Sequence, residues 1–114
     1  MNPVDEIKKT LKIEIRPKSR GNEYLEAIVE RKDLESLNEL LVKHLGPPAK
    51  KEGQEATFPK EIEDFINSIG GLWIEQSFYY KQEGKMVAYA ALWPWESNPA
   101  KTTLKAGEFE LKSG

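Results

Sequence analysis

Residues 70–94 decide the fold, and they read GGLWIEQSFYYKQEGKMVAYAALWP. Aromatic and β-branched residues dominate this stretch and recur with a period of two, which favours strands over a helix. Glu83-Gly84 in its middle is a turn signal, because glycine accepts the positive φ that a tight hairpin needs. The stretch therefore predicts a β-hairpin that ends at Pro94, since proline lacks the N–H that would continue a ladder.

The register of this hairpin depends on its loop. A two-residue loop at Glu83-Gly84 pairs Phe78 with Tyr89 and Tyr80 with Val87, whereas a three-residue loop with a bulge shifts the pairs. We favour the two-residue loop, because it gathers the large side chains on one face. The opposite face then has small residues at its centre and larger ones around them: Ser77, Ala88 and Ala90, surrounded by Trp73, Tyr79, Met86 and Leu92.

Two further strands are predicted before the hairpin. Residues 10–16 alternate apolar and polar side chains, as in a strand with one buried face, and Pro17 ends it. Residues 24–30 fit a strand or a helix. We favour the strand, because one helix continuous with the next segment would have two conflicting apolar faces. Residues 1–9 are polar and are expected to be loose.

Two helices with clear ends are predicted next. The first spans residues 34–45, with Asp33 as its N-cap and Gly46 followed by two prolines at its end. The second begins near Pro59 and ends at Gly70. Its apolar residues have the spacing of one helical stripe: Ile62, Phe65, Ile66 and Ile69. The polar residues 47–56 between the helices are expected to form a mobile connection.

Residues 102–112 predict the last strand, in which the apolar positions change parity at Gly107. A β-bulge at Ala106-Gly107 would place both halves on one face, and a turn there is the alternative. The predicted order is β-β-α-α-β-β-β. It favours an α+β fold of two layers, with a four- or five-stranded antiparallel sheet and both helices on one side, in a single domain of residues 1–114.

Composition excludes several classes of site. The 114 residues include 17 basic and 19 acidic side chains and no cysteine. The absence of cysteine rules out disulfides, thiolate metal sites and a cysteine nucleophile, and it agrees with a cytoplasmic location. The net charge of −2 favours neither a nucleic-acid partner nor an acidic tail. No apolar stretch is long enough to span a membrane.

The ionisable residues do not form a predicted catalytic or metal centre. His44 is the only histidine and lies near a helix end, where a structural role is typical. Glu61, Glu63 and Asp64 lie in the first turns of a helix, where solvated acidic side chains are typical. There is no glycine-rich phosphate motif and no nucleophile elbow. We therefore expect no enzyme and no cofactor.

Trp95, in the loop beyond Pro94, is the strongest candidate for binding. An exposed tryptophan is typical of interaction hot spots, although Trp95 can instead fold back over the edge of the sheet. We predict a non-enzymatic binding or accessory domain whose partner is a protein or a second copy of the chain. The predicted binding residues lie at the end of the hairpin and on its small-residue face: Trp95, Trp73, Tyr79, Ala88, Ala90 and Glu96.

Two further expectations concern surfaces. We expect one face of the hairpin to be left uncovered by the two helices, preferably the small-residue face, as an interface or ligand groove. A second functional hypothesis is a nucleic-acid-associated regulator that uses basic residues of the first strand and the turn after it: Lys12, Arg16, Lys18 and Arg20. The simpler explanation of these basic residues is a solvated sheet edge that resists aggregation.

Overall fold

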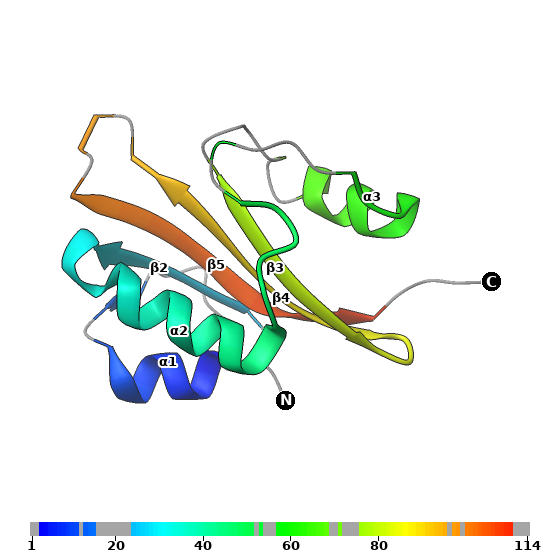
Figure 1. Ribbon diagram of the computed structural model, residues 1–114, viewed down its shortest axis with the longest axis horizontal. Helices are drawn as coiled ribbons and strands as arrows, with labels where there is room; N and C mark the ends of the chain where they lie inside the picture. Colours follow the sequence, from blue (N-terminus) through cyan, green and yellow to red (C-terminus); the bar gives the residue numbers. More distant parts are fainter. Residues whose placement is uncertain are drawn as a thin grey trace.

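The computed structural model describes residues 3–11, 13–15, 24–51, 53, 57–68, 71, 76–95, 97, 98 and 100–110. Its strands are β1 (Glu14–Ile15), β2 (Tyr24–Glu30), β3 (Ser77–Glu83), β4 (Met86–Pro94) and β5 (Lys101–Glu110). They form one antiparallel five-stranded sheet in the order β1-β2-β5-β4-β3 (Figure 1). The helices are α1 (Val4–Thr10), α2 (Leu34–Leu45) and α3 (Lys60–Ser68). The predicted α+β class and antiparallel sheet are confirmed.

Helices cover both faces of the sheet, so the expected two-layer arrangement with both helices on one side is wrong. One buried cluster joins α1 and α2 to one face, which we call the α1/α2 face. A second cluster joins α3 to the other face, the α3 face. Figure 1 shows α1 and α2 on one side of the strands and α3 on the other. Each helix has a single apolar stripe, and a sheet with two apolar faces gives both stripes a place to pack.

The α1/α2 face is built from small and medium-sized side chains. Leu37 and Leu41 of α2 are fully buried there in one cluster with Ala90 and Leu104 from the sheet. Full burial of each leucine contributes about 1.5–3 kcal/mol relative to exposure. Alanines in the strands let the helix approach the sheet closely. The small-residue face of the hairpin is therefore core, and the expectation that it is left uncovered is wrong.

The α3 face carries most of the aromatic side chains. The ring of Phe65 in α3 stacks on Phe109 of β5 with 3.8 Å between centroids and contacts Tyr89 of β4 edge-on at 4.6 Å. Ile62 and Ile66 are buried beside them, as their helical spacing predicts. Phe58, just before α3, packs against Phe78 at 5.7 Å. This helix lies over the half of the sheet that includes the hairpin tip (Figure 1).

Strand β5 has no bulge at Gly107, although its apolar side chains change there from one face of the sheet to the other. It pairs in one unbroken register with β4 and with β2, in which Gly107 lies opposite Tyr89 and Tyr24. Leu104 and Ala106 belong to the cluster on the α1/α2 face, whereas Phe109 belongs to the cluster on the α3 face. Because both faces are covered, a straight strand satisfies both halves, and the predicted bulge is wrong.

The hairpin forms, but its register differs from the prediction by two residues. Glu83 pairs with Met86, so Gly84 and Lys85 form the loop, and Tyr80 lies opposite Tyr89. Gly84 has a φ of +61°, the conformation for which glycine is suited. A shift of two residues keeps every side chain on its predicted face, so the alternation of apolar residues cannot detect it.

The start of the chain is a helix where a loose segment was expected. Val4 and Ile7 of α1 are fully buried against the α1/α2 face. Of the predicted strand over residues 10–16, Thr10 belongs to α1 and Glu14–Ile15 form β1, while residues 12 and 16 lie outside the described residues. Ile15, expected on the buried side, is 50% exposed. Two apolar residues three apart suffice for one side of a two-turn helix.

The connection after α2 is tied to the sheet at Lys50. Phe78 of β3 donates its N–H to the carbonyl of Lys50 at 3.0 Å and accepts N–H bonds from Ala49 and Lys50 at 2.8 and 3.1 Å. Lys50 is only 6% exposed, and its ammonium group donates to the carbonyl of Gln76 at 2.5 Å. Ala49 and Lys50, within the connection that was expected to be mobile, are thus hydrogen-bonded to β3, while residues 52 and 54–56 lie outside the described residues.

The bounds of β2 and α2 agree with the predicted ones, residues 24–30 and 34–45. The side chain of Asp33 makes no capping hydrogen bond, because Asp33 closes a 3-10 turn at Arg31–Asp33 instead. Gly46 ends α2 with a φ of +83°. No helix formed by the described residues is long and apolar enough to cross a membrane.

Candidate interaction surface

Two tryptophans lie at the end of β4 away from the hairpin tip. Trp93 is opposite Thr103 in the ladder between β4 and β5. The N–H of Trp95 donates to the carbonyl of Lys101 at 3.0 Å, and the N–H of Lys101 donates to Asn98 at 3.0 Å, which closes the connection between the strands. Trp95 therefore continues the ladder beyond Pro94, and its backbone is fixed.

The two indoles are held on the α3 face by neighbours from β5. The Nε1–H of Trp95 donates to Oγ1 of Thr103 at 2.8 Å, and Nζ of Lys101 lies 5.5 Å from the centre of its ring. Nζ of Lys105 lies 4.8 Å from the centre of the Trp93 ring. Each cation–π contact contributes about 0.5–1 kcal/mol at an exposed site. We call these five residues the tryptophan surface.

Both tryptophans are partly exposed. Trp95 has thus folded back over the start of β5, which is the central strand and not the edge of the sheet that one alternative expected, and the residue remains partly exposed. Its only ring donor is satisfied by Thr103. An ordered, partly exposed indole loses little conformational entropy when it binds, which is why tryptophan is enriched among hot-spot residues.

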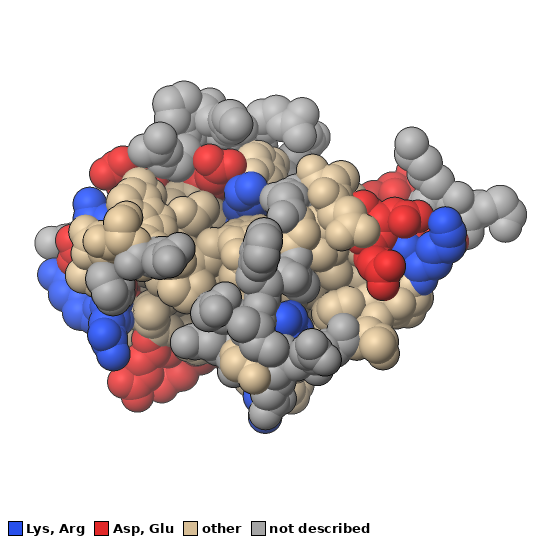
Figure 2. All heavy atoms as spheres, turned by 90° about the horizontal axis from the view of Figure 1, so that it is seen from above, with Lys and Arg blue, Asp and Glu red and all other residues tan. Residues whose placement is uncertain are grey.

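Charges on this surface alternate between neighbouring strands. Lys101 and Lys105 of β5 lie opposite Glu30 and Glu26 of β2, respectively. Glu30 also pairs with Lys32 at 3.3 Å, and Glu26 accepts the hydroxyl of Tyr24 at 2.8 Å. In Figure 2, basic and acidic side chains lie beside one another at both ends of the molecule. The tryptophan surface and the adjoining glutamates of β2 are therefore together balanced in charge.

The predicted binding residues do not form one site. Tyr79 and Ala90 are buried on the α1/α2 face, opposite the tryptophan surface, so their predicted role as exposed contacts is wrong. Ala88 is partly buried against the same cluster. Trp73 and Glu96 lie outside the described residues. The alternative basic set lies outside them too: Lys12, Arg16, Lys18 and Arg20.

Sequence reasoning named Trp95 as a binding residue, but it did not include Trp93 and it missed the partners of both tryptophans in β5. Residues 101–105 read KTTLK, with polar side chains at alternate positions, which indicates one polar or partly exposed side of a strand. This pattern does not reveal that the same side adjoins Trp93 and Trp95. That information is in the register between β4 and β5, which pairs Trp93 with Thr103.

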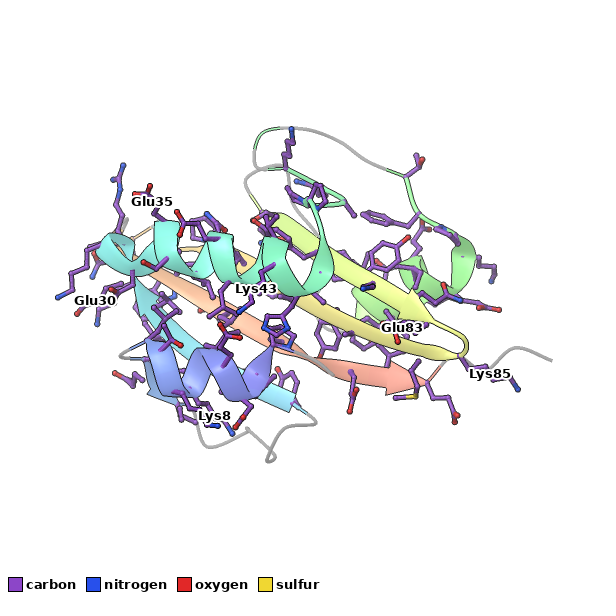
Figure 3. The ribbon with its side chains drawn as sticks, turned by 60° about the horizontal axis from the view of Figure 1, so that its bottom comes forward. Lys8, Glu30, Glu35, Lys43, Glu83 and Lys85 are labelled. Carbon is purple, nitrogen blue, oxygen red and sulfur yellow. The ribbon has the colours of Figure 1, made fainter. Side chains whose placement is uncertain are left out.

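The remaining ionisable clusters have structural or solvated settings. Nε2 of His44 lies 2.8 Å from Oε1 of Glu6, and Nζ of Lys43 lies 3.4 Å from the same carboxylate, so the pair joins α2 to α1. Figure 3 shows Lys43 on α2 beside α1. The hydrogen bond from His44, assisted by Lys43, lowers the pKa of Glu6 despite the opposing effect of desolvation.

The carboxylates of α3 are exposed, as predicted: Glu61, Glu63 and Asp64. Lys60 pairs with Asp64 at 3.8 Å. Among the described residues no group of three histidine, aspartate or glutamate side chains is placed to hold a metal ion.

Comparison of the chain with protein-family models, with curated proteins and with solved structures gives no match.

Proposed function

We propose that this protein is a non-enzymatic binding domain and that it associates with a second copy of itself through the tryptophan surface. The observation that carries the proposal is the pair of ordered, partly exposed indoles beside a charge-balanced strip of β2 and β5. A buried centre of aromatic residues with polar groups around it is the usual composition of a protein interface.

The pattern of charge makes the strip complementary to itself. The column of lysines in β5 lies beside the column of glutamates in β2. A twofold axis that runs between these strands and along them places the lysines of one copy against the glutamates of the other. Closed twofold dimers use the same patch on both copies, so a patch with this pattern satisfies their requirement.

A protein partner fits this surface better than a nucleic acid does. Binding to phosphates draws its free energy from lysines and arginines that release counterions. Here Lys101 and Lys105 each have a glutamate opposite them in the neighbouring strand, which lowers the local positive charge. Alternating charges suit a partner that carries both signs.

Charge reversal tests the proposal. One variant carries Lys101→Glu and Lys105→Glu, and a second carries Glu26→Lys and Glu30→Lys. We expect the wild-type protein to sediment as a dimer at micromolar concentration. Each variant should sediment as a monomer, because like charges then meet across the twofold axis, with a dissociation constant raised by about tenfold or more. An equimolar mixture of the two should dimerise again.

The matched control exchanges an exposed ion pair far from this surface. Lys81 and Glu83, 3.7 Å apart, lie at the hairpin tip, at the other end of the sheet from Glu30 (Figure 3). A variant with Lys81→Glu and Glu83→Lys should dimerise like the wild type. A wild-type protein that is monomeric at every concentration, or charge-reversed variants that dimerise unchanged, would refute self-association. Salt-sensitive binding of an oligonucleotide by such a monomer would instead support the nucleic-acid hypothesis.

A further inference from the structure

A cavity of about 210 Å³ opens on the α1/α2 face, separate from the tryptophan surface. It lies between the first half of α2, the connection after α2 and the ends of β3, β4 and β5. Its polar wall consists of one amide, one ammonium group and three hydroxyl groups, from Asn38, Lys51, Ser77, Tyr79 and Thr102. Two leucines and two prolines form the rest of the wall.

One hydrogen bond orients the amide in this wall. The hydroxyl of Tyr79 donates to Oδ1 of Asn38 at 2.9 Å, so the oxygen of that amide is engaged and its two N–H groups are left for another acceptor. Tyr79 is 4% exposed, and burial raises the pKa of its phenol. Tyr79 therefore stays protonated near neutral pH and keeps this bond.

The hydroxyl of Thr102 is a polar group on an almost completely buried residue of this wall. Thr102 is only 2% exposed and lines the cavity. Among the described residues its hydroxyl has no hydrogen-bond partner, and it is not one of the fully enclosed atoms, so it faces the cavity. Buried polar groups in folded proteins are nearly always hydrogen-bonded. The hydroxyl of Ser77 in the same wall also lacks a partner among the described residues.

The charge of the wall selects the ligand. Lys51 is exposed at the mouth, and among the described residues that line the cavity there is no carboxylate. The polar groups therefore supply hydrogen-bond donors and a positive charge. Such a set stabilises a carboxylate, whose two oxygens accept hydrogen bonds only. The leucine and proline side chains provide contact for an apolar body.

We infer that this cavity binds a small organic carboxylate. Its carboxylate group is held by Lys51, Thr102 and the amide N–H groups of Asn38, and its apolar body packs against Leu34 and Leu92. The volume equals about seven water molecules at roughly 30 Å³ each, which limits the ligand to a short-chain or single-ring acid. Pockets that bind drug-sized ligands are larger, at roughly 300–1,000 Å³.

Titration with simple acids, followed by ¹H–¹⁵N NMR of the full chain, tests this inference. The probes are butyrate and benzoate, with butyramide and benzamide as uncharged counterparts of the same shape. We expect saturable shifts at Asn38, Lys51, Ser77 and Thr102 with the acids and much weaker ones with the amides. Thr102→Val should weaken binding by about tenfold, since it removes a buried hydrogen bond. Lys51→Gln should weaken it by about fivefold, as expected for an exposed charge.

Lys81→Gln is the matched control, because it removes an exposed lysine at the hairpin tip, and it should leave the affinity unchanged. Lys51 is exposed, so its substitution keeps the inference testable even where Thr102→Val impairs folding. The inference is overturned by acids that give no saturable shifts, by amides that bind equally well, or by Lys51→Gln and Thr102→Val variants with wild-type affinity. The inference is also overturned if the acids shift only residues of another surface and Lys51→Gln leaves those shifts unchanged.

Discussion

The hydroxyl of Tyr79 in β3 donates a hydrogen bond of 2.9 Å to Oδ1 of Asn38 in α2. The two residues come from segments far apart in the chain, and this bond connects α2 directly to the hairpin. Tyr79 belongs to the buried cluster of the α1/α2 face, and Asn38 is half-buried beside it. A hydrogen bond needs a defined distance and angle, so it adds a directional constraint to the apolar packing between α2 and the sheet.

Replacing Tyr79 by phenylalanine removes this bond and leaves the amide oxygen of Asn38 without its partner. We expect Tyr79→Phe to lower the free energy of unfolding by about 1–2 kcal/mol, measured by urea denaturation. Tyr80→Phe is the control, since the hydroxyl of Tyr80 has no hydrogen-bond partner among the described residues. Equal losses in the two variants would show that the bond to Asn38 contributes nothing.

Ala90 tests the placement of α2. It is fully buried on the α1/α2 face, so Ala90→Arg forces a charged side chain into the core. We expect a loss above about 4 kcal/mol and no cooperative thermal transition in circular dichroism. Met86→Arg changes an exposed residue on the same side of the same strand and should be tolerated. An Ala90→Arg protein of wild-type stability would mean that this face is surface rather than core.

The hydrogen bond between Glu6 and His44 predicts that the stability of the folded protein depends on pH. The pKa of Glu6 is lowered by its hydrogen bond with His44, so the folded state favours the ionised carboxylate. The stability gained is complete above the ordinary glutamate pKa of 4.5 and is lost as the pH falls through the lower folded-state value.

Glu6→Gln should therefore be less stable than the wild type at about pH 6, and the difference should shrink at about pH 3. Asp5→Asn, which breaks an exposed pair with Lys9, should have little effect at either pH. If Glu6→Gln loses the same amount of stability at both pH values, the carboxylate acts through packing and not through its charge.

Gly84 tests the loop of the hairpin. Its φ of +61° is unfavourable for any residue with a Cβ atom, while no neighbouring atom lies within 4 Å of a Cβ built there. Gly84→Ala should therefore cost about 1 kcal/mol, from the backbone conformation alone. Lys85→Ala, at the next position of the loop, should cost less. The measurement is the midpoint of urea denaturation, and an unchanged midpoint for Gly84→Ala would mean that the loop adopts another turn.

The elements that sequence predicted well have long or complete patterns. The five leucines of α2 and the alternation in the hairpin each repeat often enough to define a period. The two buried residues of α1, Val4 and Ile7, do not, and the alternation that follows them suggested a longer strand. Elements whose apolar residues repeat several times were therefore predicted, and α1, with only two such residues, was missed.

Pairing and packing were beyond what the sequence could predict. The hydrophobic pattern is identical in registers that differ by two residues, so only the turn at Gly84 chooses between them. Each helix showed its own apolar stripe but not the face it covers. This is why Ala90 and Tyr79 were expected at the surface, and why the sequence left open whether Trp95 is exposed or folded back over the sheet.

The central position of β5 governs when the molecule can fold. Ala27 and Leu104 are paired neighbours in the sheet although most of the chain separates them, and β2 and β4 meet only through β5. During synthesis, at about 5–20 residues per second, β2 and α2 emerge long before their partner strand exists. Closing so large a loop makes folding slow compared with a helical bundle. In the meantime the open edge of β2 is a place where a nascent chain needs protection from aggregation.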